Sequence, residues 1–207
     1  MKLLYGTTNE GKLQLMRRYL SRLPEVELIG LQDLEKSPPV LEECGQTPLE
    51  NARIKAWAYY QFFQMPVFSC DSGLYFEGLK ESLQPGVHVR RVGGKELSDE
   101  EMTDYYAGLA RTYGDLTARY KNAVCLVLDQ THSYESMDDA LSGEPFLLTS
   151  VPHPRRQKGF PLDCLSKNIA NGAYYYDLGG TCQDDVALDD GFLTFFQNSL
   201  QKYLQII

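Results

Sequence analysis

The chain has 207 residues, of which 43% are hydrophobic and 23% are charged, as in an ordinary globular protein with a substantial core. Its formal net charge of −8 argues against a general nucleic-acid-binding protein, because phosphate backbones are bound by basic surfaces. A small phosphorylated substrate is not excluded, since a few well-placed lysines suffice to bind it.

The cysteines are odd in number, and none lies at C-x-x-C spacing from another. A disulfide framework or a zinc site is therefore not expected. The chain starts directly with strand-like sequence and has no apolar run long enough to span a bilayer. We expect a cytoplasmic protein without a membrane partner.

The first third of the chain predicts a strand, a turn, a helix and a second strand. Lys2 to Tyr5 has the pattern of a short buried strand, and a polar, glycine-bearing turn over residues 6–12 follows it. The helix is indicated by apolar residues at helical spacing, namely Leu13, Met16 and Leu20. Val26 to Ile29 predicts the second strand, and residues 32–46 predict a loop.

A strong helix start follows at Thr47-Pro48-Leu49-Glu50, where Thr47 caps, proline takes the first helical position and glutamate reaches back. This helix should run to about Phe63. Residues 65–70 predict a strand that ends at Asp71-Ser72-Gly73.

The second half predicts a capped helix from Ser98 to about Arg111 and a long strand from Leu116 to Asp129. A hairpin connection over 130–145, a strand over 146–151, an irregular segment over 152–185 and a helix over 190–204 complete the chain. Because strands and helices mix without strict alternation, we expect an α/β class with a mixed sheet and α+β character.

Two lysines are candidate phosphate ligands. Lys12 follows the glycine-bearing turn at a helix start, where backbone N–H groups attract phosphate. Asn51 and Lys55 are four apart on the next helix and share a face. Alternatively, these are an ordinary turn with a solvated lysine and a charged surface helix.

Two acidic positions are candidate metal ligands. Asp71 follows a strand, where a carboxylate could activate water or bind a divalent cation. Glu42 or Glu43 could share Mg²⁺ with it, because this ion takes one or two carboxylates together with water and phosphate oxygens. A turn aspartate and a solvated acidic loop are the alternatives. The three histidines suggest no hydrolase triad.

The order of these segments resembles the inosine/xanthosine triphosphate pyrophosphatase family. The family's T-G-N-x-G-K is matched by Thr7-Thr8-Asn9-Glu10-Gly11-Lys12, and its E-x-G by Glu43-Cys44-Gly45. Its F-x-E-N-A-x-x-K-A is matched by residues 48–56, its D-D-S-G-L by residues 70–74, and its P-G-x-x-S-A-R by Pro85-Gly86-Val87 with Arg91. The match covers about residues 1–130.

The resemblance implies that residues 1–207 form a single pyrophosphatase-like domain of two lobes, elongated, with a central cleft, and usually a homodimer. It implies Mg²⁺-dependent hydrolysis of a nucleoside triphosphate, an aberrant purine such as ITP or XTP, to the monophosphate and pyrophosphate.

Site residues carried over from the resemblance fall into three groups. The catalytic group is Asp71, Lys12 and Lys55. The metal ligands are Glu43 and Asp71. The substrate-binding group is Thr7, Asn9, Asn51, Ser72, Gly73, Arg91, Phe160 and Asp163, with Phe160 stacking on the base and Asp163 hydrogen-bonding it.

The chain departs from the family pattern in two places. Cys70 stands where the family has an acidic residue, which implies the loss of one carboxylate from the metal site. Residues 158–163 match G-G-F-G-Y-D-P only in part, and K-x-x-x-S-H-R, which reads the purine edge, has no counterpart. Losing that hydrogen-bonding reader predicts an altered or relaxed base choice.

Two alternatives to an active pyrophosphatase remain. One is a paralogue that binds a nucleotide or another phosphorylated metabolite with little or no turnover. The other is an enzyme for a different phosphorylated metabolite, with residues 155–158 as a new anion site.

Overall fold

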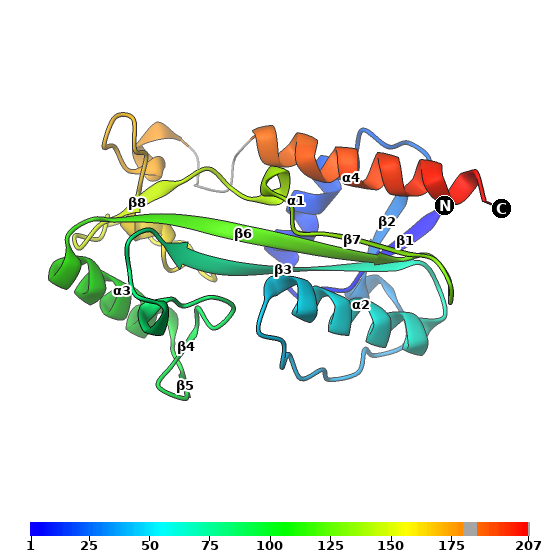
Figure 1. Cartoon of the computed structure of the whole chain (residues 1–207), viewed down its shortest axis with the longest axis horizontal. Coiled ribbons are helices and arrows are strands. Elements are labelled where there is room, and N and C mark those ends of the chain that lie inside the picture. Colours follow the sequence, from blue (N-terminus) through cyan, green and yellow to red (C-terminus); the bar gives the residue numbers. More distant parts are fainter. Residues whose placement is uncertain (180–185, 207) are drawn as a thin grey trace. The chain divides into compact units, whose positions relative to one another are not determined.

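Strands and helices mix along the chain in the computed structural model, which describes residues 1–179 and 186–206, the side chains of 186–189 excepted (Figure 1). The helices are α1 (Glu10–Leu20), α2 (Pro48–Phe63), α3 (Asp99–Tyr113) and α4 (Val186–Leu204). The strands are β1 (Lys2–Tyr5), β2 (Glu27–Gly30), β3 (Val67–Phe76), β4 (Arg91–Val92), β5 (Lys95–Glu96), β6 (Leu116–Val127), β7 (Ser133–Ser136), β8 (Phe146–Leu148) and β9 (Ser166–Lys167).

The main sheet is mixed, which confirms the α/β class. Its described strands pair in the order β2-β1-β3-β6-β8-β9, with β7 added beside β6. β1 is parallel to both β2 and β3, whereas β6 is antiparallel to β7 and β8. The chain forms two compact units, the first made of residues 1–72, 122–142 and 186 onward, the second of 73–121 and 143–185. β3 and β6 supply residues to both units.

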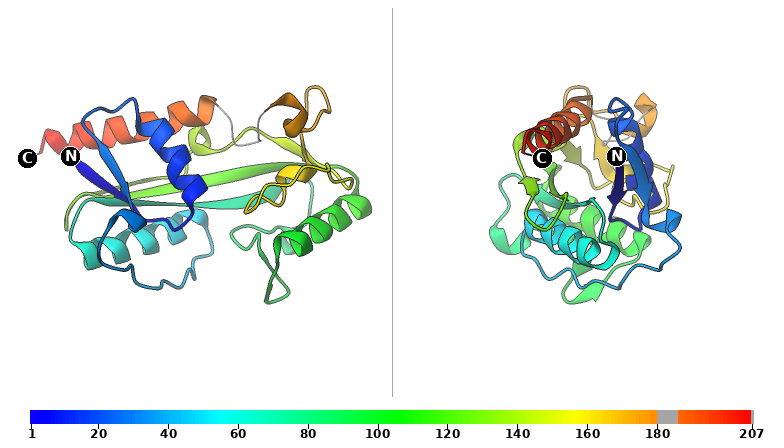
Figure 2. Two further views of the ribbon diagram at one scale, coloured as in Figure 1. Left: turned by 180° about the vertical axis from the view of Figure 1, so that it is seen from behind. Right: turned by 90° about the vertical axis from the view of Figure 1, so that its right-hand side faces the viewer.

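The first unit is a sheet covered by helices on both faces, as Figures 1 and 2 show for α2 and α4. Residues alternate across its strands, so Leu3 and Phe68 pack with α1 and α4, whereas Leu4 and Val67 pack with α2. The aromatic ring of Phe68 stacks on Tyr5 with centroids 4.5 Å apart. Two apolar cores therefore fix the strands between the helices.

α4 comes unusually close to the rest of the first unit at Gly191. A Cβ atom added there would lie 1.9 Å from the carbonyl oxygen of Ala140 in the turn before β8. Glycine is needed at this position because backbone, not a flexible side chain, occupies the space.

The second unit packs α3 against strand residues and the segment that follows β8. Buried contacts join Tyr106 and Ala110 of α3 to Phe146, Leu162 and Leu165. The expected capping box is confirmed, because Ser98 accepts from the Glu101 N–H and Glu101 accepts from the Ser98 N–H. The last turn of α3 extends to Tyr113, two residues beyond the prediction.

Several predicted element boundaries were wrong. The strand expected to end at Asp71-Ser72-Gly73 continues through them to Phe76. The strand expected over 146–151 stops at Leu148, and the segment expected to be irregular contains β9 and two 3₁₀ turns. α4 begins four residues before the predicted start at Asp190. The acidic residues 184 and 185 lie outside the described part of the chain.

Candidate functional site

An ion-paired cluster joins α2 to β3 in the first unit. Nζ of Lys55 lies 2.9 Å from Oδ1 of Asp71 and 3.2 Å from Oε2 of Glu43. The side chains of Lys55 and Asp71 are only 12% and 11% exposed, whereas that of Glu43 is 42% exposed. Burial lowers the pKa of Lys55, but the two carboxylates outweigh it, so the pKa is raised and the ammonium stays charged.

The amide of Asn51 fixes the second oxygen of Asp71. Its Nδ2 donates to Oδ2 of Asp71 at 3.1 Å, and its Oδ1 accepts from the Gly45 N–H at 2.8 Å. Gly45 has no room for a side chain, since an added Cβ would lie 2.6 Å from Oδ1 of Asn51. In this structure Asn51, predicted to bind substrate, positions Asp71 and the loop that carries Glu43.

The turn between β1 and α1 forms as its sequence predicts. Asn9 caps α1, since its side chain accepts from the Lys12 N–H at 3.1 Å, and Oγ1 of Thr7 accepts from the Asn9 N–H at 3.2 Å. An added Cβ at Gly6 would lie 2.4 Å from Ser69 and from Tyr59. The glycine thus lets the turn approach β3 and α2.

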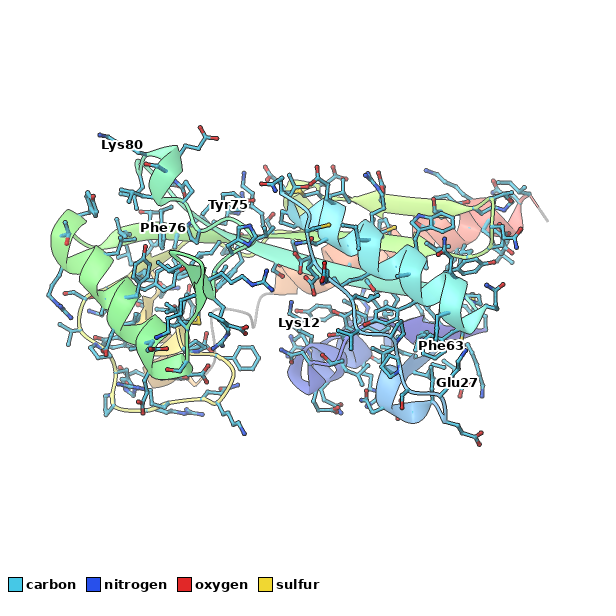
Figure 3. All side chains as sticks on the ribbon, turned by 90° about the horizontal axis from the view of Figure 1, so that it is seen from below. Lys12, Glu27, Phe63, Tyr75, Phe76 and Lys80 are labelled. Carbon is cyan, nitrogen blue, oxygen red and sulfur yellow. The ribbon has the colours of Figure 1, made fainter. Side chains whose placement is uncertain are left out.

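Lys12, labelled in Figure 3, lies in the first turn of α1, within electrostatic range of Lys55 and Asp71. Its pKa is lowered by burial and then by the positive charge of Lys55, against the attraction of Asp71 and Glu43. The ammonium groups of Lys12 and Lys55 are therefore close enough to repel. Two neighbouring cations beside a helix N-terminus form a site suited to a multiply charged anion.

Cys70 lies on the other face of β3. It packs with Tyr5 and Phe68 among the residues that contact α1 and α4, whereas its neighbour Asp71 points to α2. Burial raises the pKa of the Cys70 thiol to about 12, and the nearby Tyr5 hydroxyl and Lys12 offset this only in part. Cys70 is thus a neutral, packed thiol at physiological pH.

The carboxylates of Glu43 and Asp71 fit a hard divalent cation by donor chemistry, because Mg²⁺ takes one or two carboxylates and completes its shell with water and phosphate oxygens. Within residues 1–179 and 186–206, no group of three or more His, Cys, Asp or Glu side chains is arranged to hold a metal. Among the described residues, the candidate metal ligands are therefore only these two carboxylates, and a bound substrate would supply further oxygen ligands to the ion.

The remaining predicted residues belong to or border the second unit. Ser72 is partly buried, and Gly73 is buried where β3 pairs with Gly86 through Leu74. Arg91 is exposed on β4. The neighbouring Arg90 instead donates from Nη2 to Oδ1 of Asp99 at 2.8 Å.

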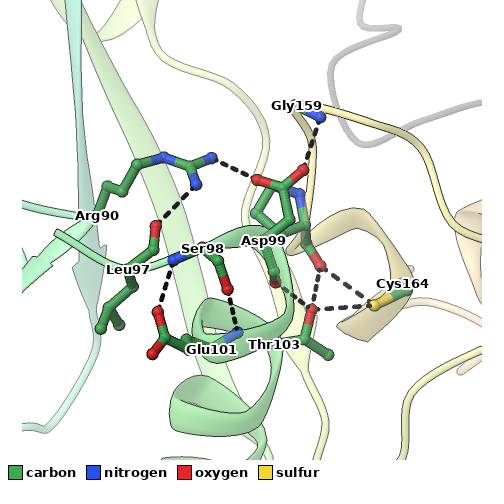
Figure 4. Close-up of polar contacts among 9 residues, drawn as sticks. Arg90, Leu97, Ser98, Asp99, Glu101, Thr103, Gly159 and Cys164 are labelled. Atoms are coloured by element: carbon green, nitrogen blue, oxygen red, sulfur yellow. Dashed lines mark hydrogen bonds and ion pairs between the residues drawn. The ribbon is translucent and has the colours of Figure 1, made fainter.

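Phe160 is partly buried, and α3 holds the backbone on both sides of it (Figure 4). Oδ2 of Asp99 accepts from the Gly159 N–H at 2.9 Å, and Oγ1 of Thr103 donates to the Pro161 carbonyl at 3.2 Å. The Gly159 hydrogen bond, and then Arg90, lower the pKa of Asp99 against some burial. Asp163, the expected base partner, is only 4% exposed.

The segment 153–158 has local contacts of its own. Arg155 lies over the Tyr176 ring, 4.8 Å from its centroid, and Arg156 donates to the carbonyl of His153. His153 contacts Asp177 at 3.2 Å and accepts from the Arg155 N–H at Nδ1. These contacts hold the basic segment against Tyr176 and Asp177.

Sequence reasoning missed the roles of Gly6, Ser69 and Gly45. The two glycines allow close approaches of the backbone to side chains, and Ser69 donates to the Gly6 carbonyl. Such contacts between distant parts of the chain have no local sequence pattern. The Arg53–Glu135 pair between α2 and β7, at 2.7 Å, was also missed because its partners are far apart in sequence.

The Ham1 family model matches residues 3–165. A dITP/XTP pyrophosphatase of Aquifex aeolicus is 42% identical over 101 residues, covering 46% of each chain. One of Leptospira interrogans is 31% identical over 146 residues, covering 70% of this chain and 72% of the relative. A HAM1 protein structure from Coxiella burnetii has a TM-score of 0.69 at 21% identity, with 100% of both chains covered.

The structure shows a mixed α/β fold with a lysine–carboxylate cluster. The chain belongs to the Ham1 family. It spans 46%, 65% and 49% of the lengths of the relatives from Aquifex aeolicus, Christiangramia forsetii and Oceanobacillus iheyensis. No described helix is both long and apolar enough to cross a membrane.

Proposed function

We propose that this protein hydrolyses nucleoside triphosphates to the monophosphate and pyrophosphate with Mg²⁺. The observation that carries the proposal is the meeting of Lys12, Lys55 and Asp71 in one unit, with Asn51 and Glu43 as their partners. The relatives from Aquifex aeolicus and Leptospira interrogans, which carry the name dITP/XTP pyrophosphatase, support the same reaction.

In the proposed reaction the lysines bind the phosphate chain. Lys12 and the N-terminus of α1 take up phosphate oxygens and stabilise the negative charge that moves to the leaving pyrophosphate. The Asp71 carboxylate, oriented by Asn51, accepts a hydrogen bond from the attacking water. Water adds across the bond between the α and β phosphates, and its proton passes to the carboxylate or solvent. A bound Mg²⁺ would neutralise phosphate charge, with Glu43 and Asp71 as its ligands.

We further propose a relaxed base choice among purines. The sequence carries no Ser-His-Arg, so no counterpart of the family's purine reader is present to reject other bases. Phe160 would stack on the base in a way that is largely independent of its polar edge.

The resemblance to the inosine/xanthosine triphosphate pyrophosphatase family also supports a homodimer. Light scattering of the purified protein measures this oligomeric state.

A panel of ITP, XTP, dITP, ATP and GTP with Mg²⁺ tests the proposal through pyrophosphate release. We expect release from the aberrant purines, with less discrimination against ATP and GTP than a dedicated reader gives. Asp71→Asn should lower kcat by about 100-fold or more, in the range of general acid–base contributions. Asp138→Asn, an exposed aspartate of the same unit, is the matched control. Absence of pyrophosphate from every nucleotide would contradict the proposal.

One observation favours binding without turnover as the second candidate. Both oxygens of Asp71 already accept hydrogen bonds, from Lys55 and Asn51, which leaves the carboxylate less available to water. Thermal stabilisation by ITP without pyrophosphate release would distinguish this candidate, and turnover would reject it.

A further inference from the structure

The ammonium group of Lys55 lies between the carboxylates that a divalent cation would use. Its Nζ is 2.9 Å from Asp71 and 3.2 Å from Glu43, within hydrogen-bonding distance of both. The Lys55 and Asp71 side chains are almost fully enclosed. A tethered cation therefore already pairs with both carboxylates, and a free metal ion would have to displace it.

The charges around this position also cancel. Lys12 and Lys55 supply two positive charges, and Asp71 and Glu43 supply two negative ones. Cys70 adds none, since a thiol is neutral at pH 7 and its side chain lies on the opposite face of β3. A cluster without net charge offers little attraction to a free divalent ion. A bound triphosphate would make it strongly negative and supply further oxygen ligands.

This inference rests on the proposed function. We propose that Lys55 is an internal cation that occupies the Glu43–Asp71 pair in the free protein, so that the divalent metal enters only together with the triphosphate. On binding, Lys55 exchanges its carboxylate partners for phosphate oxygens and releases both carboxylates to the metal. Lys55 thereby couples metal binding to substrate binding.

Mn²⁺ binding in the absence of nucleotide tests the coupling. Free Mn²⁺ is measured by electron paramagnetic resonance for the wild-type protein, Lys55→Met and Lys2→Met. Lys2 carries the same charge but pairs with Glu27 on the surface at 3.7 Å, so it is the matched control. We expect Lys55→Met to bind Mn²⁺ at least about tenfold more tightly than wild type, because removing a unit charge about 4 Å from a divalent ion has that effect even with water-like screening. Lys2→Met should match wild type.

A second substitution locates the gained site. Adding Glu43→Gln to Lys55→Met should abolish most of the gain, since one of the two carboxylates is then lost. Equal Mn²⁺ binding by wild type and Lys55→Met would overturn the proposal, as would a gain that persists in the double variant.

Two features keep the test independent of other failures. If circular dichroism shows that Lys55→Met does not fold, Mn²⁺ binding by the wild-type protein, with and without nucleotide, still tests the proposal. Tight Mn²⁺ binding by wild type without nucleotide overturns the coupling. Mn²⁺ binding that appears only with the α,β-methylene analogue of ITP, beyond the Mn²⁺ that the analogue binds without protein, supports it. If no nucleotide is hydrolysed, the proposed function fails, but the comparison of wild type with Lys55→Met remains a valid test of the internal cation.

Discussion

Replacing Asn51 with alanine perturbs the point where the loop of Glu43 and the carboxylate of Asp71 are held together. Asn51 is only 3% exposed, and its amide joins the Gly45 N–H to Oδ2 of Asp71. The substitution removes both hydrogen bonds and leaves the Gly45 N–H buried without its partner.

The magnitude follows from these contacts. A hydrogen bond to a charged group contributes about 1.5–3 kcal/mol, and an unsatisfied buried donor costs about 1–3 kcal/mol. The higher helix propensity of alanine offsets about 0.5 kcal/mol of this loss. We therefore expect Asn51→Ala to lower the free energy of unfolding by about 3 kcal/mol.

Urea unfolding followed by circular dichroism measures this change. The midpoint should fall while the m-value stays constant, because the folded core is unchanged. Asn198→Ala, at an exposed position of α4, is the control and should shift stability by less than about 0.5 kcal/mol. A loss below about 1 kcal/mol for Asn51→Ala would refute the bridging role, because the hydrogen bond to the Asp71 carboxylate alone should contribute more than that.

Three further results are expected. Gly191→Ala should destabilise the protein by about 2 kcal/mol or more in urea unfolding, because its Cβ would meet the Ala140 carbonyl; an unchanged midpoint would contradict the packing of α4. Thr103→Val should raise KM for ITP more than it lowers kcat, because the loop that carries the candidate stacking residue loses one of its two described hydrogen bonds to α3; equal KM values would contradict this. At pH 8, mass spectrometry after iodoacetamide treatment should find exposed Cys44 modified and Cys70 unmodified, since the Cys70 pKa of about 12 leaves little thiolate; rapid Cys70 labelling would contradict its burial.

Local signals predicted the helices well. The capping residues Thr47 and Ser98 each act as the sequence indicates, because capping depends on a few neighbouring residues. Asn9 also caps a helix, which was not predicted. Glu50 departs slightly, since its side chain accepts from the Gln46 N–H. The predicted end of β3 was wrong because Ser72-Gly73 is a common turn sequence. Only pairing with other strands keeps these residues extended.

The candidate site was predictable in composition but not in geometry. The order of motifs identified Lys12, Lys55 and Asp71, and the structure brings their charges together. No local pattern could show that Lys55 bridges Glu43 and Asp71, because the three come from a loop, a helix and a strand. Strand alternation places Cys70 on the face opposite Asp71, and the loss of a metal ligand at this position stays a prediction.

We propose that the Lys12–Lys55–Asp71 cluster splits a nucleoside triphosphate between its α and β phosphates. Phosphorus NMR of ITP incubated with the protein and Mg²⁺ tests this most directly, because it separates pyrophosphate from orthophosphate. We expect IMP and pyrophosphate to form in equal amounts, and Asp71→Asn to slow the formation of both by about 100-fold or more. Formation of IDP and orthophosphate, or no change in ITP, would contradict it.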